Sequence, residues 1–227
     1  MFFALLLITF NGFISAQSLC KNPNIAYTCY VSYLEKYGYH EDNNGYLPSF
    51  RSLDFQMRTH SLAVICSDFD TLTSCLGSSS NDCVNLDVFF TFTRNQQEAM
   101  WYLQNHAFFE FVCGNGKDLY RQNELCIQKA FERISLTDRM KECGQPQYVT
   151  NSAEQCGEIL SVTDCVHQKM SVECGERAGT GACGAATNIE RRMQFLDVAC
   201  LTEMDMRCSS NGLTFIVSSI ILFLYYF

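Results

Sequence analysis

Residues 152–175 read SAEQCGEILSVTDCVHQKMSVECG, and this stretch decides the fold of the 227-residue chain. Its apolar residues recur every three or four positions, as on one face of a helix: Ile159, Val162, Val166 and Met170. Ser152 and Gln155 form a capping-box pattern at its start, and Gly175 is a typical helix stop at its end. The pattern predicts one long amphipathic helix.

The three cysteines of this helix constrain how it is bridged. Cys156, Cys165 and Cys174 are nine residues apart, which puts neighbours on opposite faces and about 13.5 Å apart along the axis. Bridged Cα atoms lie within about 7 Å of each other. None of the three can therefore bond to another, and the helix is predicted to lie between other segments to which it is bridged.

All the cysteines lie between the two ends of the chain, at Cys20, Cys29, Cys66, Cys75, Cys83, Cys113, Cys126, Cys143, Cys156, Cys165, Cys174, Cys183, Cys200 and Cys208. The count is 14, and the closest pairs are eight positions apart. Zinc and redox sites usually bring two cysteines within two to four residues. The cysteines predict a framework of up to seven disulfides, with no metal or cofactor, and spacing alone leaves the full pairing open.

The two ends carry uncharged apolar segments. Residues 1–16 predict a signal peptide, with an uncleaved anchor or a buried first helix as the alternatives. The hydrophobic segment 211–227 predicts either a signal for a glycosylphosphatidylinositol (GPI) anchor, with Ser209 or Ser210 as the lipid-attachment residue, or a short membrane span. Residues 17–210 then form an extracellular, cysteine-rich region displayed at the cell surface.

Helical patterns dominate the rest of that region. We expect helices at about Arg94–Cys113, Pro23–Lys36 and Phe50–Cys75. Four glycines in residues 175–184 predict a turn, and the capping-box pattern of residues 187–190 predicts the start of the last helix.

The expected fold class is all-α, a disulfide-stapled bundle of about five or six helices. No linker composition separates two domains, so one domain is expected. Two stapled halves that meet near Gln145–Asn151 are the alternative.

Tyrosines crowd the first helix, where Tyr30, Tyr33 and Tyr37 share a face. They either pack that helix onto the core or form a binding surface. Phe89 and Phe90 are both expected in the core.

Motifs of known catalytic mechanism are absent from the sequence. The histidines are scattered, at His40, His60, His106 and His167. His167 is the one candidate general base, but no nucleophile in a recognisable turn accompanies it. The acidic pairs Asp68/Asp70 and Glu203/Asp205 are expected on a solvated surface. No catalytic residue is predicted.

The net charge is −8, and no basic patch stands out, which disfavours nucleic-acid binding. Arg191 and Arg192 are the only adjacent basic residues. We expect both to face solvent in the first turns of the last helix.

The cysteine pattern resembles a known family. Cys165-x8-Cys174-Gly175-x7-Cys183, the earlier Cys66-x8-Cys75-x7-Cys83 and the downstream Cys200 and Cys208 are similar to the cysteine-rich secreted domain of unknown function that is expanded in nematodes. The resemblance spans about Cys20 to Cys208 and implies an extracellular, largely helical protein without assigned catalytic residues.

Three functions remain open. The first is a noncatalytic extracellular module that binds an unknown extracellular protein or other ligand at the cell surface. The second is a secreted carrier of a small apolar ligand, which needs an enclosed apolar cavity. The third is a secreted hydrolase, which needs a cleft that gathers a histidine, a serine and a carboxylate.

Overall fold

The computed structural model describes residues 20–50, 60–133, 142–144 and 152–209, and this part of the chain contains helices and no strand. The predicted signal peptide (1–16), the hydrophobic segment 211–227, Ser210 and the stretch 145–151 lie outside it. The described helices are α1 (Pro23–Glu35), α3 (Leu62–Leu76), the 3₁₀ turn η1 (Gly77–Ser79), α4 (Ser80–Cys83), α5 (Leu86–Thr93), α6 (Gln96–Cys113), α7 (Lys117–Arg121), α8 (Glu124–Arg133), α10 (Ser152–Cys174), α11 (Glu176–Met193) and α12 (Val198–Cys208). Six of them have eleven or more residues. The predicted all-α, disulfide-stapled bundle is confirmed.

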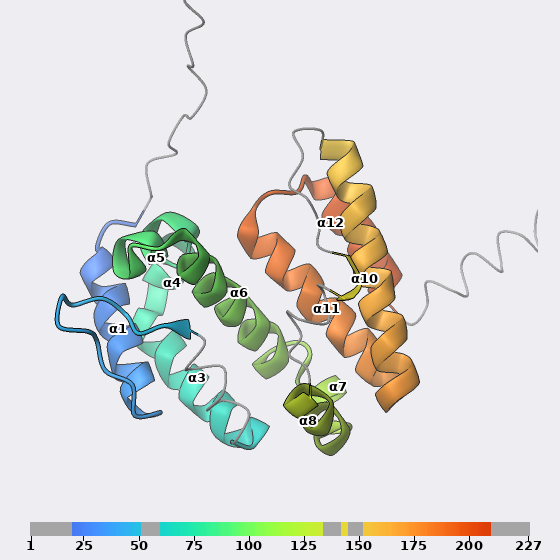
Figure 1. The fold of residues 1–227 in the computed structure, drawn as a ribbon, viewed down its shortest axis with the longest axis horizontal. Coiled ribbons are helices and arrows are strands. Elements are labelled where there is room, and N and C mark those ends of the chain that lie inside the picture. Colours follow the sequence, from blue (N-terminus) through green and yellow to red (C-terminus); the bar gives the residue numbers. More distant parts are fainter. Residues whose placement is uncertain (1–19, 51–59, 134–141, 145–151, 210–227) are drawn as a thin grey trace, which may run out of the picture.

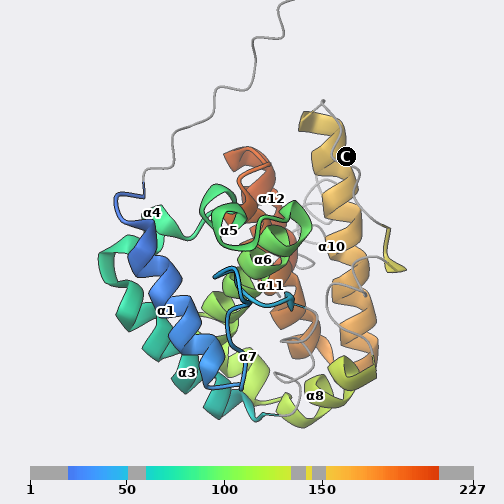
Figure 2. The ribbon, with the colours of Figure 1, turned by 60° about the vertical axis from the view of Figure 1, so that its left-hand side comes forward.

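Helix α6 runs through the middle of the molecule (Figure 1). Helices α1, α3, α4 and α5 lie on one side of it, and α10, α11 and α12 lie on the other (Figure 1). In the view of Figure 2, α1 and α3 lie on the left and α10 lies on the right. One continuous core of buried apolar side chains extends from α1 to α11. A smaller cluster of Ile159, Leu160 and Met204 joins α10 to α12. The pocket described below lies where α6 meets α11.

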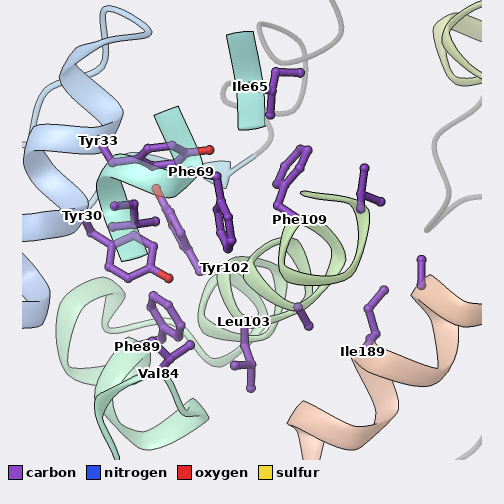
Figure 3. Close-up of a cluster of buried hydrophobic side chains, with 14 of the residues drawn as sticks. Tyr30, Tyr33, Ile65, Phe69, Val84, Phe89, Tyr102, Leu103, Phe109 and Ile189 are labelled. Atoms are coloured by element: carbon purple, nitrogen blue, oxygen red, sulfur yellow. The ribbon is translucent and has the colours of Figure 1, made fainter. Parts of the chain in front are cut away.

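Aromatic rings fill the core beside α6 (Figure 3). Tyr30 packs edge-on against Phe89, with ring centroids 4.9 Å apart. Tyr30, Tyr33 and Tyr37 are each at most 4% exposed, so this tyrosine face packs α1 onto the core and is not a binding surface. The core prediction is also right for Phe89.

The core prediction is wrong for Phe90, which is 44% exposed. Successive residues of a helix point about 100° apart. Phe89, which is fully buried, occupies the inner face of α5 and leaves its neighbour outside.

The glycine-rich segment after α10 is a helix, which corrects the predicted turn. Gly175 alone connects α10 to α11, with a φ of +91° that favours glycine. Helix α11 begins at Glu176, so Gly179, Gly181 and Gly184 lie inside it. The segment forms one arm of a helical hairpin.

Close packing explains why these positions are glycine. A Cβ atom at Gly179 would lie 2.7 Å from the backbone oxygen of His167 in α10. A Cβ atom at Gly184 would lie 2.3 Å from the ring of Phe111 in α6. The glycines therefore allow two neighbouring helices to approach α11, a use that the sequence pattern does not distinguish from a turn.

The predicted helix start at residues 187–190 is wrong, because α11 already begins at Glu176. Thr187 lies in the middle of α11, and its hydroxyl donates to the carbonyl of Cys183 at 3.1 Å. The last helix, α12, begins instead after Asp197, whose carboxylate accepts the Cys200 N–H at 2.8 Å.

The bridges form two sets that no disulfide links. The first set lies within residues 20–113 and the second within residues 126–208. The pairs are Cys20–Cys83, Cys29–Cys75 and Cys66–Cys113, then Cys126–Cys174, Cys143–Cys165, Cys156–Cys200 and Cys183–Cys208. The bridges Cys126–Cys174 and Cys143–Cys165 both span residues 145–151. The boundary between the two sets therefore lies earlier in the chain, between Cys113 and Cys126.

The constraint derived for α10 is confirmed. Its three cysteines bond to three separate partners: Cys156 to α12, Cys165 to Cys143, and Cys174 to α8. Helix α10 is thus tied on different faces to segments before and after it in the chain.

Candidate functional site

A pocket of about 730 Å³ lies between α6, the end of α11 and α12. Its volume falls within the usual range for small-molecule sites. Polar and charged side chains make up most of its lining, which consists of Asn81, Glu110, Phe111, Asn115, Gly184, Asn188, Arg191, Arg192, Gln194 and Asp205. We call it the interhelical pocket. It joins α6 of the first disulfide set to α11 and α12 of the second.

Two contacts hold α6 and α11 together beneath the pocket. The ring of Phe111 lies against Gly184, where no side chain could fit without displacing it. The Asn188 side chain donates to the backbone oxygen of Ala107 at 2.8 Å. Because these contacts fix the spacing of the two helices, they also place Glu110 opposite Arg192.

Glu110 and Arg192 form a two-pronged ion pair. Arg192 Nε donates to Glu110 Oε2 at 2.9 Å, and Arg192 Nη2 donates to Oε1. Asn188 adds a third hydrogen bond to the carboxylate, at 3.0 Å. Burial acts to raise the pKa of Glu110, but the hydrogen bonds from Arg192 and Asn188 outweigh it and hold this pKa below its ordinary value. Glu110 is therefore ionised at neutral pH.

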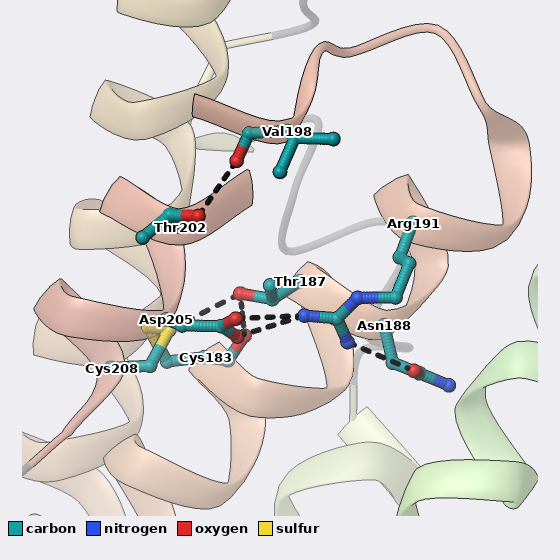
Figure 4. Close-up of polar contacts among 8 residues, drawn as sticks. All are labelled: Cys183, Thr187, Asn188, Arg191, Val198, Thr202, Asp205 and Cys208. Atoms are coloured by element: carbon teal, nitrogen blue, oxygen red, sulfur yellow. Dashed lines mark hydrogen bonds and ion pairs between the residues drawn. A yellow bond between two sulfur atoms is a disulfide. The ribbon is translucent and has the colours of Figure 1, made fainter. Parts of the chain in front are cut away.

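A second ion pair crosses the pocket from α11 to α12 (Figure 4). Arg191 Nη2 contacts both carboxylate oxygens of Asp205, at 3.0 and 2.8 Å. Its Nη1 lies 3.4 Å from the side-chain oxygen of Asn188. Asn188 therefore links the two ion pairs into one network.

Disulfides hold α12 in the position that this second pair requires. Cys183–Cys208 ties the end of α12 to the middle of α11, and Cys156–Cys200 ties its first turn to α10. Thr187 lies 3.3 Å from the sulfur of Cys208 (Figure 4). Asp205 is one turn before that anchored end of α12.

The rim of the pocket carries amides with hydrogen-bonding capacity to spare. The side chains of Asn81, Asn115 and Gln194 are exposed and make no hydrogen bond within the described residues. Gln194 closes α11 in a left-handed conformation, with a φ of 58°, and its N–H donates to the Glu190 carbonyl at 3.2 Å. Gln194 is thus the residue at which α11 ends beside the pocket.

Sequence reasoning missed this site, and its prediction for the two arginines is partly wrong. Arg191 and Arg192 lie in the last turn of α11 and not in the first turns of the final helix. Arg191 is exposed as expected, but the Arg192 side chain is only 19% exposed and is paired. The one available signal was the adjacency of two arginines. The partner of Arg191 lies 14 residues away in the sequence, and the partner of Arg192 lies 82 residues away.

The predicted disulfide residues are all accounted for, because every one of the 14 cysteines lies in a bridge and none is free. The lipid-attachment candidate Ser209 is exposed directly after α12. Within the described residues, no helix is both long enough and apolar enough to cross a bilayer.

Within the described part of the chain, three of the four residues in the expected acidic surface pairs form ion pairs. Asp68 binds Lys36 at 2.8 Å, and Glu203 binds Arg207 at 2.7 Å. Asp205 is the only member of these pairs that lines the interhelical pocket.

The histidines do not gather into a site. His167 lies 3.3 Å from Glu176, and His40 lies 3.8 Å from Glu35. His106 is 2% exposed, and its Nδ1 is 2.6 Å from the hydroxyl of Tyr30. Burial, aided by the charge of Arg192, lowers the pKa of His106 to about 4, so its ring is neutral. Among the described residues, no group of three side chains is arranged to hold a metal ion.

Glu190 is a second titratable group that the sequence did not mark. It is 3% exposed in α11, and its Oε2 atom has no hydrogen-bond partner within the described residues. Burial raises its pKa to about 7. It is not among the residues that line the interhelical pocket.

No protein-family model, curated protein sequence or solved structure matches this chain. The resemblance to the nematode-expanded secreted domain therefore stays a prediction, and functional inference rests on the chemistry of the pocket.

Proposed function

We propose that this chain is a noncatalytic extracellular binding module and that the interhelical pocket is its binding site. The observation that carries the proposal is the linked network of two ion pairs and Asn188, fixed by helices from both disulfide sets. A site whose polar groups are already positioned loses little conformational entropy when it binds. The seven bridges also indicate an extracellular or secreted protein.

The pocket suits an apolar carrier poorly. Carriers of apolar molecules need a cavity lined mainly by hydrophobic side chains. Phe111 is the only large apolar side chain of this lining, which otherwise carries two arginines, two carboxylates and four amides. An apolar ligand would remove these groups from water without replacing their hydrogen bonds, at a cost of about 1–3 kcal/mol for each unsatisfied group.

Hydrolysis also finds little support in this pocket. Glu110 and Asp205 are both present, and a pair of carboxyl groups is what glycoside hydrolysis requires. One of the two must be protonated to act as the general acid, which calls for a raised pKa. Arg192 and Asn188 lower that of Glu110 instead, and the described lining contains no histidine or serine.

We further propose that the protein is secreted and held at the cell surface by segment 211–227 or by a lipid that replaces it. Ser209 is exposed after the last described helix, as attachment to a GPI anchor would require. Treatment of expressing cells with phosphatidylinositol-specific phospholipase C tests this idea. Release of a chain that ends near Ser209 or Ser210 supports a lipid anchor, and retention of a chain with Phe227 intact indicates a span.

A fragment screen by nuclear magnetic resonance tests the binding site. Polar fragments (amino acids, nucleosides and monosaccharides) are added to the isotope-labelled protein with its bridges formed. We expect shifts confined to the end of α6, the last two turns of α11 and the part of α12 around Asp205. Shifts elsewhere, or none with any fragment, would count against the pocket as the binding site.

A further inference from the structure

The charges of the interhelical pocket balance within the pocket itself. Arg192 is paired with Glu110, and Arg191 with Asp205. A charged ligand would have to compete with one of these internal partners, because each charge already faces its opposite. A neutral ligand leaves both pairs intact, so the network favours a molecule without net charge.

The hydrogen-bonding groups that remain are both donors and acceptors. An arginine has five N–H donors, and a carboxylate has about four acceptor positions. Glu110 accepts three hydrogen bonds from its neighbours, and Asp205 accepts two. Arg192 donates from Nε and Nη2 only, which leaves Nη1. Donors and acceptors therefore lie side by side along the network.

The rim adds groups of the same dual character. Asn81, Asn115 and Gln194 each offer an amide that can both donate and accept, and none is used within the described residues. A hydroxyl group has the same dual capacity, so several hydroxyls on one ligand match this lining. Phe111 is the one large apolar side chain among the described lining residues, and its ring lies against Gly116 and Gly184, so hydrogen-bonding groups supply most of the surface that a ligand would meet.

We propose that the interhelical pocket binds a neutral carbohydrate, such as a short oligosaccharide. This inference rests on the proposed function, because it names the ligand class of the same site. The pocket volume of about 730 Å³ admits a small ligand of this kind. The hydroxyls of the sugar bridge the arginine donors and the rim amides, while both ion pairs persist.

Titration of the full, disulfide-bonded chain with three types of probe tests the proposal. The first is a set of neutral mannose and N-acetylglucosamine oligosaccharides of two to four units, free or attached to a carrier glycoprotein. The second is a sulfated form of the same oligosaccharides, and the third is glycylglycine as a zwitterion. Calorimetry gives the affinity, and the side-chain amide resonances of the rim give the location.

The test variant combines Asn115→Ala with Gln194→Gly, which removes two rim amides. We expect the fold to tolerate both changes, because neither side chain is hydrogen-bonded within the described residues and glycine suits the φ of 58° at position 194. Affinity for the neutral oligosaccharide is expected to fall at least about tenfold, as the loss of one or two hydrogen bonds implies. The matched control is Gln168→Ala, at an exposed α10 position outside the pocket, and should bind as the unaltered chain does.

Several results overturn the inference. Unchanged sugar affinity in the double variant would place the sugar elsewhere. Binding of the sulfated or zwitterionic probe in this pocket, without the neutral one, would remove the carbohydrate inference and leave the proposed function standing. No response at the rim resonances to any probe would count against both. If a neutral oligosaccharide binds in the pocket, the two forms of that probe distinguish the source of the ligand. Binding only to the carrier glycoprotein indicates a glycan attached to another protein, and binding to the free oligosaccharide indicates a soluble sugar.

Discussion

Replacing Gly179 by alanine should destabilise the protein, although alanine is the better helix former. Within a helix the change by itself gains about 0.8–1.0 kcal/mol. Here the new Cβ atom would lie 1.9 Å from the Oγ of Ser171 and 2.7 Å from the backbone oxygen of His167. The serine can rotate, but the backbone oxygen moves only if α10 moves. Overpacking of this kind costs about 1–3 kcal/mol, so we expect a net loss of up to about 2 kcal/mol.

Gly157→Ala is the matched control, because Gly157 lies inside α10 with no heavy atom near the place of a new Cβ. Only the helix preference applies there, so this variant should gain about 1 kcal/mol. Because the helix gain is common to both changes, the two variants should differ by the overpacking cost, about 1–3 kcal/mol in their free energy of unfolding. For a chain of this size that difference corresponds to about 2–12 °C in the unfolding midpoint.

Denaturant and thermal unfolding of the oxidised protein, without reductant, measures both variants. Adding Ser171→Ala to Gly179→Ala should recover part of the loss, because it removes the nearer of the two contacts. If Gly179→Ala were as stable as Gly157→Ala, the close approach of α10 and α11 would be refuted, and with it our explanation of the glycine-rich helix.

Three further predictions concern charge and connectivity. Burial raises the pKa of Glu190 from 4.5 to about 7, because the folded protein disfavours the ionised carboxylate. The free energy of unfolding should therefore fall as the pH rises from about 4.5 to 7. At about 1.4 kcal/mol per pKa unit, the free energy of unfolding of Glu190→Gln should exceed that of the parent by about 3 kcal/mol at pH 8. At pH 4 the two proteins should be equally stable. Denaturant unfolding at a series of pH values measures this difference. Glu110→Gln should cost about 1–3 kcal/mol in the same assay by leaving a largely buried arginine without its carboxylate, whereas Glu203→Gln, in an exposed pair, should cost at most about 1 kcal/mol. Cleavage of the chain only after Lys117 or Arg121, without reduction, should give two pieces once the protein is denatured, each with its own disulfides. Mass spectrometry should detect the two pieces separately, and detection of a single linked piece would contradict the pairing.

Local features of the sequence predicted much of the fold correctly. The apolar face of α10, from Ile159 to Met170, is buried as expected. The nine-residue spacing of Cys156, Cys165 and Cys174 predicted that none bonds to another. These predictions hold because helix periodicity and the reach of a disulfide are properties of short stretches of chain.

Two errors in assigning helices arose where a residue type serves two purposes. Glycine suits both a turn and a close helix contact, so Gly179 and Gly184 could not be assigned without knowing what packs against them. The Thr187–Glu190 pattern matches a capping box, but only when a helix starts there. For the glycines the deciding fact is the neighbouring helix, α10 or α6. For Thr187 it is that α11 already begins at Glu176.

The chain by itself determined the helical class, the long α10 and the use of its cysteines in bridges. Only the tertiary structure decided which cysteines pair, and which charges meet. Glu110 and Arg192 are 82 residues apart, and no local rule connects them. They meet because Phe111 packs against Gly184 and brings α6 onto α11. Such contacts depend on the packing of whole helices, which a pattern of three or four residues does not encode.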